Sequence, residues 1–261
     1  LMLRADPPAE VADLAALVES DPSLTAQVMR YANAPFFGYR GRVDSVHTAI
    51  SRVLGYDMVM HLVLGLATAR PFRIPADGPL GLRAFWRHAV YSAAMMQALS
   101  RGLPRTAALR AGTAYLAGLL HNFGLLLLGH LFPEHYRALC AAAAARPGRA
   151  LPELEHEVLG CDHAWMGATL LQAWNLPPEV IIVAREHHHL EYTGAHAEAA
   201  ALALVCDRAL KLHGIGDGDD AVLPPNLLQH LHLDELKVLG AINRILEGCS
   251  SLDAMARQLA A

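Results

Sequence analysis

The feature that most constrains this chain is a polar pair, His121-Asn122, set inside an apolar run from Tyr115 to Phe132. A buried imidazole or carboxamide that lacks a hydrogen-bond or metal partner costs a few kcal/mol, so both side chains need partners. The pair therefore predicts a polar centre inside the core. The other side chains that could complete this centre are distant in sequence: His88, His163, His187, His188, His189 and Asp207.

Composition, charge and cysteine spacing indicate which classes of protein this chain can belong to. Hydrophobic residues make up 54% of the 261 residues and charged residues 18%, which predicts helices buried on at least one broad face of a large core. The net charge of -4 comes with no sustained basic block, so we expect no nucleic-acid partner. The apolar run is interrupted and shorter than the roughly 20 residues of a membrane span, so we expect no membrane segment. The four cysteines form no Cys-x-x-Cys pair, which is typical of a reducing compartment and predicts a cytoplasmic protein.

Hydrophobic periodicity predicts helices along the whole chain and no strand. The predicted helices, bounded by capping residues, prolines and glycines, are 9–19, 22–33, 44–55, 57–69, 82–101, 106–132, 134–145, 152–158, 163–174, 179–188, 197–213, 234–247 and 252–260. The segment 106–132 is expected to form two helices that pivot near Gly124. The acidic loop 216–220 lacks the EF-hand pattern and is expected to be a solvated turn. The fold class is therefore all-α, a two-lobed multi-helix bundle.

The stretch 70–79 contains several prolines and a glycine and interrupts the helical pattern. We predict an N-terminal helical lobe at 1–73, a second helical lobe at 74–214, and a C-terminal helical extension at 215–261 that packs on the second lobe. The chain has three tryptophans beside apolar helix faces, and core packing is the expected role of each: Trp86, Trp165 and Trp174.

Two explanations of the polar centre remain open at this point. Histidine and aspartate ligate divalent metals, and a bound cation can lower the pKa of water to about 7 for attack on a phosphoester. Alternatively, each imidazole bonds a backbone carbonyl or a neighbouring side chain, which is the commoner arrangement for any single buried histidine.

The local sequence favours a particular family. Gly118-Leu119-Leu120-His121-Asn122-Phe123-Gly124 resembles the Gly-Leu-Leu-His-Asp-Ile-Gly signature of the HD superfamily, in its HDOD branch of bacterial signalling proteins. Other stretches resemble the same branch in the same order, over about residues 8 to 210: Asp21 to Asn33, Ala49 to Gly55, Phe85 to His88, and Glu157 to Pro177 followed by His187-His188. The resemblance implies that the second lobe is HD-like.

The resemblance also implies which residues formed the ancestral site. The metal ligands of active superfamily phosphohydrolases fall on His88, His121 with Asn122, and Asp207. The added ligands of the related HD-GYP phosphodiesterases fall on His163, His187 and His188. Asn122 stands where the hallmark aspartate would be, which removes a negative charge from the site.

Further departures from the pattern count against catalysis. Leu125 stands where active HD-GYP members usually carry a lysine, and no Gly-Tyr-Pro signature follows His189. Phosphodiester hydrolysis depends on positive groups that stabilise the developing charge. We therefore expect a vestigial site with no catalytic residues, which makes the chain a pseudoenzyme.

The function implied by the resemblance is that of a non-catalytic signalling or output module of a bacterial regulatory protein. The chain begins at Leu1, and we expect a fragment of a larger, response-regulator-like protein. The expected partners are a signalling protein or an attached receiver or sensor domain, with a nucleotide second messenger as a further candidate. The alternative is a metal-dependent phosphodiesterase or nucleotide phosphohydrolase. We expect no cofactor, and the alternative is a divalent metal, Mn, Fe, Zn or Mg, at the surviving ligands.

Overall fold

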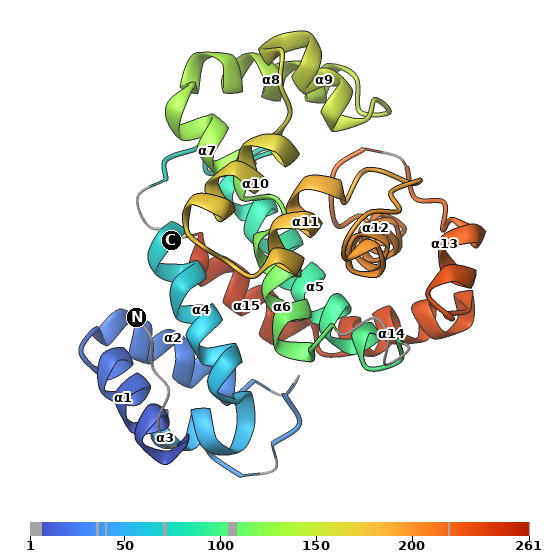
Figure 1. Cartoon of the computed structure of the whole chain (residues 1–261). Coiled ribbons are helices and arrows are strands. Elements are labelled where there is room, and N and C mark those ends of the chain that lie inside the picture. Colours follow the sequence, from blue (N-terminus) through green and yellow to red (C-terminus); the bar gives the residue numbers. More distant parts are fainter. Residues whose placement is uncertain are drawn as a thin grey trace.

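The computed structural model describes residues 7–34, 37–39, 41–69, 72–103, 109–218 and 220–260. These residues form helices joined by turns and contain no strand, which confirms the predicted all-α fold (Figure 1). The helices are α1 Pro7–Glu19, α2 Pro22–Ala32, α3 Val46–Thr48, the π-helix η2 Ala49–Leu54, α4 Tyr56–Ala69, α5 Leu82–Ser100, α6 Ala111–Leu120, α7 Phe123–Leu131, α8 Pro133–Ala145, α9 Leu151–Leu159, α10 His163–Ala173, α11 Pro178–Glu186, α12 Ala197–Lys211, α13 Pro225–His230, α14 Glu235–Glu247 and α15 Cys249–Leu259.

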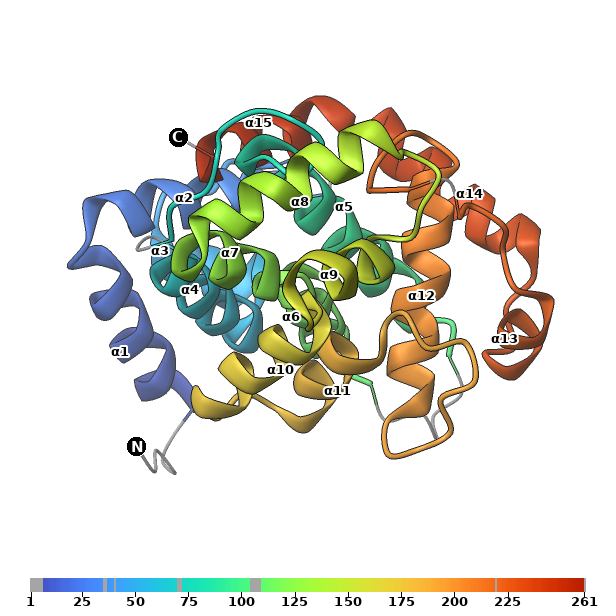
Figure 2. The same ribbon diagram turned by 90° about the horizontal axis from the view of Figure 1, so that it is seen from above.

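The N-terminal helices α1 to α4 gather at one side of the molecule, opposite α12 and α13 (Figures 1 and 2). Their ends follow from local sequence. Asp21 accepts a hydrogen bond from the Leu24 amide at 3.1 Å and so caps α2, and Ser45 accepts from the Thr48 amide at 3.1 Å and caps α3. Gly55 adopts φ 84° and ends η2, which allows α4 to begin at the next residue.

Helix α5 is the central element and is buried along most of its length. It packs against α6 and α12, and also against α14 and α15 of the C-terminal segment. Helix α6 approaches it closely because Gly118 has no side chain: a Cβ added there would lie 2.7 Å from the Ala93 backbone. This close packing brings the end of α6 near His88 of α5.

The domain boundaries at 1–73, 74–214 and 215–261 stay predictions. Residues 70 and 71, at the predicted break between lobes, lie outside the described residues. Within the described part, α14 and α15 pack on α5, and α15 also contacts α2. The C-terminal helices therefore contact both the central helix α5 and the N-terminal helix α2.

The described part of the segment 106–132 forms two helices, α6 and α7, as predicted, and the break at His121-Asn122 lies near Gly124. Helix α6 ends at Leu120, and Asn122 adopts φ -96° and ψ 12°, outside the helical region. Gly124 lies inside α7, where an added Cβ would collide with the His163 carbonyl oxygen. The glycine therefore allows α7 to pack on α10, and the polar pair itself forms the break. The predicted start at Thr106 lies outside the described residues.

One segment, Ala111–Leu131, has the length and apolar composition of a membrane-crossing helix. It is divided between α6 and α7, and 78% of its most apolar window is buried inside the protein. The core packing of these two helices accounts for their apolar composition.

Two further expectations need correction, and one helix was not predicted. Trp165 is 51% exposed, because His163, Ala164 and Gly167 take the inner face of α10 and Trp165 points away from it. The acidic loop is not wholly solvated, since the Asp217 side chain is 18% exposed and faces Lys211. Helix α13 was not predicted, because six residues are too few to show a helical period.

Candidate metal centre

The seven residues predicted for the site lie together in the interior of the protein. Imidazole rings form a continuous chain, with centroid separations of 5.2 Å from His88 to His121, 4.9 Å from His121 to His187 and 4.0 Å from His187 to His188. Three helices, one break between helices and one helix end supply the set: His88 from α5, His163 from α10, Asp207 from α12, His121 and Asn122 from the α6–α7 break, and His187 and His188 from the end of α11.

One part of the centre, which we call the aspartate network, consists of His88, Asn122, Asp207 and Lys211. The Asn122 carboxamide donates to Nδ1 of His88 at 3.1 Å. Because Nδ1 accepts, the proton of the neutral ring lies on Nε2, which is 3.1 Å from Oδ1 of Asp207. The Lys211 ammonium lies 2.8 Å from the other Asp207 oxygen.

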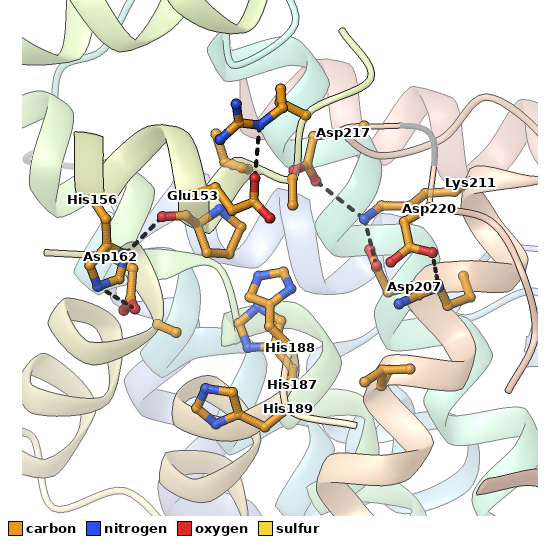
Figure 3. Close-up of a pocket in the computed structure, with 18 of the residues that line it drawn as sticks. Glu153, His156, Asp162, His187, His188, His189, Asp207, Lys211, Asp217 and Asp220 are labelled. Carbon is orange, nitrogen blue, oxygen red and sulfur yellow. Dashed lines mark hydrogen bonds and ion pairs between the residues drawn. The ribbon is translucent and has the colours of Figure 1, made fainter. Parts of the chain in front are cut away.

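Charge in the aspartate network is balanced internally. The side chains of Asp207 and Lys211 are both 8% exposed, and Figure 3 shows Lys211 between Asp207 and Asp217. Burial alone would raise the pKa of Asp207, but the His88 hydrogen bond and the Lys211 charge hold that pKa below its ordinary value. Burial alone would lower the pKa of Lys211, but Asp217 and Asp207 raise it. Both groups are therefore charged at neutral pH.

The aspartate network fits a metal ion poorly. Both Asp207 oxygens are engaged, one by His88 and one by Lys211. The remaining oxygen that could bind a metal is Oδ1 of Asn122, which is buried and has no hydrogen-bond partner among the described residues. A neutral amide oxygen provides little of the negative charge that holds a divalent cation.

The other part, which we call the three-histidine cluster, consists of His163, His187 and His188. Its Nε2 atoms converge, with 3.3 Å between His163 and His187 and 3.1 Å between His163 and His188. One ligand atom from each of the three residues lies within 4.8 Å of the others, so these histidines could hold a metal ion.

Hydrogen bonds at the far side of the His163 and His187 rings fix the orientation of these two rings. Nδ1 of His163 donates to the Glu155 carboxylate at 2.8 Å, and Nδ1 of His187 donates to the Ala184 carbonyl at 2.9 Å. In the neutral rings, the lone pairs on Nε2 therefore face one another. A positive charge between them, either a proton on His163 or a metal ion, relieves the repulsion. A carboxylate behind a ligating histidine is the usual second shell of a metal site.

The imidazoles of the centre differ in the direction in which their pKa values are shifted. Burial lowers the pKa of His121 to about 3 and lowers those of His187 and His188 well below the ordinary value. For His163, burial also acts to lower the pKa, but the Glu155 carboxylate outweighs it and raises the pKa. Neutral imidazole is the form that binds metals, so most of the cluster is already in the ligating state.

The cluster and the network open on a shared cavity of about 540 Å³, seen in Figure 3. Its wall is strongly charged and includes Arg149, Glu153, Arg185 and Asp217. His189, the third histidine of the triplet, also lines this cavity, but its side chain is 65% exposed and pairs with Glu186.

Sequence reasoning missed two residues of the centre. Glu155 is fully buried, and its spacing of four from Leu151 on α9, beside Leu154, would have assigned it to the apolar face. Lys211 follows Asp207 by four residues, the spacing at which side chains on a helix face one another. In both cases the signal was a charged residue at a position that the helical period assigns to the core.

Comparison with known proteins identifies the family. The HDOD domain family model matches residues 1–190. A crystal structure of a candidate signal transduction protein from Marinobacter aquaeolei VT8 is 35% identical, with a TM-score of 0.84, and the match covers all of this chain and 56% of that one. A structure of a candidate phosphohydrolase from Shewanella amazonensis SB2B is 22% identical, covers 98% of this chain and 95% of that one, and has a TM-score of 0.67.

An uncharacterized protein of Treponema pallidum (strain Nichols) is 28% identical over 189 residues, which are 72% of this chain and 35% of that protein. The chain therefore spans about a third to a half of the length of these longer relatives. The histidine and aspartate positions predicted from the HD signature lie together in a fold shared with these structures. Since the family match extends over most of the chain, this protein belongs to the HDOD domain family.

Proposed function

We propose that this chain is a non-catalytic signalling module that retains the pocket of an HD-type hydrolase as a binding scaffold. The observation that carries this proposal is the 2.8 Å contact between Lys211 and Asp207. The lysine supplies the positive charge that a metal ion would supply beside Asp207. With Asn122 in place of an acidic residue, this part of the site balances its charge without a metal.

The chemistry of phosphoester hydrolysis supports the same conclusion. A metal in an active site of this kind activates water and stabilises charge on the phosphoryl oxygens. Here the Asp207 carboxylate is bound by Lys211 and His88, and Asn122 offers an uncharged oxygen. No group in the aspartate network is free to act as a strong anionic ligand.

Metal binding at the three-histidine cluster is a separate part of the proposal. The Nε2 atoms of His163, His187 and His188 would hold the ion, and Glu155 would orient His163. Imidazole ligands suit Zn or Fe better than Mg, which prefers oxygen ligands. We propose that an ion at this position stabilises the pocket and takes no part in hydrolysis.

The alternative function is metal-dependent phosphohydrolysis, and the Shewanella amazonensis protein is named as a candidate phosphohydrolase. One observation favours it: His121 donates from Nδ1 to the Gly118 carbonyl at 2.7 Å, which leaves Nε2 of the neutral ring as a further free nitrogen ligand. Four neutral or partly neutral imidazoles could bind a metal without the aspartate network.

Metal analysis and a substrate screen distinguish the two functions. Protein loaded with Mn, Fe or Zn is assayed with cyclic dinucleotides and nucleotide phosphates, beside the variant His187→Ala. We expect wild-type protein to show no turnover above that of the variant. Turnover that requires both the metal and His187 would contradict the proposal.

A gain-of-function variant tests the role of Lys211 directly. In Asn122→Asp with Lys211→Met, a carboxylate is restored and Asp207 is released, so we expect one additional equivalent of bound Mn relative to wild type. Asn122→Asp alone should not gain it, because Lys211 still holds Asp207. If the single variant binds the additional metal equally well, Lys211 does not replace a metal.

The partner is also proposed, as a signalling protein, an attached receiver or sensor domain, or a nucleotide second messenger in the shared cavity. The greater length of the relatives supports an attached domain. The charged wall of the cavity supports a polar ligand. Calorimetric titration with a panel of cyclic dinucleotides, using Arg185→Ala as the pocket variant, tests the nucleotide. Absence of heat with every member of the panel would leave protein contacts as the means of signalling.

A further inference from the structure

The loop that follows α12 brings a further carboxylate, Asp217, to the wall of the shared cavity. Gly216 and Gly218, on either side of it, adopt φ of 122° and 68°, which side chains disfavour, so the chain can turn sharply over the metal centre. Ile215 is buried and anchors the loop. Gly216 lies against the aspartate network, since a Cβ added there would be 3.5 Å from the His88 ring. The loop therefore holds Asp217 beside the metal centre.

Asp217 differs from the other carboxylates that line the cavity, because it accepts no hydrogen bond from the part of the chain that the structure describes. The other four each bind an arginine, a lysine or a backbone amide: Glu153, Asp162, Asp207 and Asp220. The ion-pair partner of Asp217 is Lys211, whose ammonium lies 3.9 Å away (Figure 3). Because Lys211 also binds Asp207, at 2.8 Å, its charge is already balanced. Asp217 is therefore the carboxylate of the wall that can turn to another cation.

A divalent ion at the three-histidine cluster requires negative charge that the cluster does not contain. Its ligands are imidazoles, which are neutral when they bind a metal. The carboxylate in contact with the cluster is Glu155, 2.8 Å from Nδ1 of His163, and it balances one of the two positive charges of the ion. Asp207 is not available for the other charge, since His88 and Lys211 engage both of its oxygens. A buried charge without a partner is unfavourable, so the site needs a second carboxylate.

Asp217 lies close enough to act on the cluster. It lines the same cavity as His188. Burial lowers the pKa of His163, whereas the Glu155 carboxylate and, next in strength, the Asp217 carboxylate raise it. The negative charge of Asp217 is therefore felt at the cluster while the side chain still faces Lys211. To approach an ion held by the histidines, Asp217 has to give up only this 3.9 Å contact.

We propose that Asp217 is the fourth ligand of a divalent metal ion held by His163, His187 and His188. This inference rests on the proposed metal binding at the three-histidine cluster and adds the residue that supplies the missing charge. Three imidazoles and one carboxylate form a tetrahedral set that suits Zn. A site closed by four protein ligands leaves no position for the water that hydrolysis requires, in agreement with a non-catalytic role. Metal binding draws Asp217 away from Lys211, which keeps its partner Asp207.

The test measures Zn affinity by competition with a chromophoric chelator, and the visible absorption spectrum of the protein loaded with Co. Loss of a carboxylate behind a ligand weakens metal binding about 10- to 100-fold, and for a direct ligand we expect the upper end, so Asp217→Asn should weaken Zn binding about 100-fold. Its cobalt spectrum should differ from that of wild type, because the ligand set has changed. The metal-free variant is expected to fold, since Asp217 lies on a loop and accepts no hydrogen bond among the described residues.

The matched control is Asp220→Asn, which removes a carboxylate from the same loop and the same cavity wall, where it pairs with Arg208. Its Zn affinity and cobalt spectrum should equal those of wild type. Equal Zn affinity in the Asp217 and Asp220 variants would overturn this inference and leave metal binding by three histidines intact. Weaker affinity with an unchanged cobalt spectrum would also overturn it, since Asp217 would then act through its charge and not as a ligand. Wild-type protein that binds neither Zn nor Co would overturn the proposed metal binding as well.

Discussion

The aspartate network and the three-histidine cluster are neighbours in one buried centre. Each contacts a buried carboxylate, but the charge of that carboxylate is balanced by a different group in each part. Asp207 of the network is neutralised by an ammonium from the next turn of its own helix, Lys211. Glu155, behind the cluster, has no lysine or arginine partner among the described residues and instead faces His163. One carboxylate is balanced by a fixed charge, and the other requires a proton or a metal ion on the histidine side.

Asn122, which stands where the HD signature has an aspartate, therefore affects the two parts unequally. It donates to His88, so the carboxamide completes the network by hydrogen bonding. The cluster does not include Asn122, and its nitrogens could hold a metal ion. Under the proposed function, the network balances its charge without a metal, and the cluster keeps metal-binding geometry.

Acidification should produce the largest effect, in protein kept metal-free with a chelator. The pKa values of His121, His187 and His188 are lowered in the folded state, so their stabilisation is present above the unfolded pKa of about 6.5 and is lost as pH falls below it. Each contributes about 1.4 kcal/mol per pH unit to the loss. The pKa of His163 is raised, so its contribution is fully present below pH 6.5 and is lost as pH rises.

Urea unfolding at pH 6.5, 5.5 and 4.5 measures this loss. The variant His187→Asn with His188→Asn should show a shallower dependence on pH, since two of the titrating groups are gone. A free energy of unfolding that stays constant from pH 6.5 to 4.5 would mean that these imidazoles are not buried in the neutral form.

The next largest effect is expected from Lys211→Met, which leaves the buried Asp207 charge with His88 as its remaining partner. Breaking a buried ion pair in this way costs about 3 kcal/mol of unfolding free energy. Asp207→Asn combined with Lys211→Met should recover most of the loss, because the carboxamide is neutral and still accepts from His88. Equal destabilisation by the single and double variants would show that Lys211 contributes through packing and not through charge.

A smaller effect is expected from Glu155→Gln on metal affinity at the cluster. Loss of the carboxylate behind a ligating histidine typically weakens metal binding about 10- to 100-fold. Titration with Zn, followed by the rise in melting temperature, measures it. The matched control is Glu153→Gln, an exposed carboxylate two residues earlier that pairs with Arg149. Identical Zn affinity in the two variants would show that Glu155 does not support metal binding at the cluster.

The smallest effect is expected from His189→Ala, which defines the border of the cluster. His189 follows two cluster residues in sequence but is exposed and paired with Glu186. Zn affinity should stay within about twofold of wild type, against loss of most of the affinity in His188→Ala. A comparable loss in both variants would extend the site to His189.

Much of the fold could be predicted from the sequence, because caps and helical period are local properties. Asp21, Gly55 and Asp162 mark helix ends where the structure has them. The division of 106–132 into two helices near Gly124 was also predicted, but the role of the glycine was not, because the sequence shows that a glycine is present and not what approaches it. Only the packing of α7 on α10 reveals that its missing side chain makes room for His163.

By itself, the sequence determined that this protein is an all-helical HDOD chain with a buried polar centre, since an apolar run that contains His121-Asn122 must provide partners for both. Which partners they would be depended on tertiary structure. Lys211 and Glu155 are ordinary charged helix residues until α12 and α9 pack inward, because neutralisation of a buried charge depends on distances of about 3 Å between side chains from separate elements. The fold therefore decided that one carboxylate is balanced by a lysine and the other by a histidine.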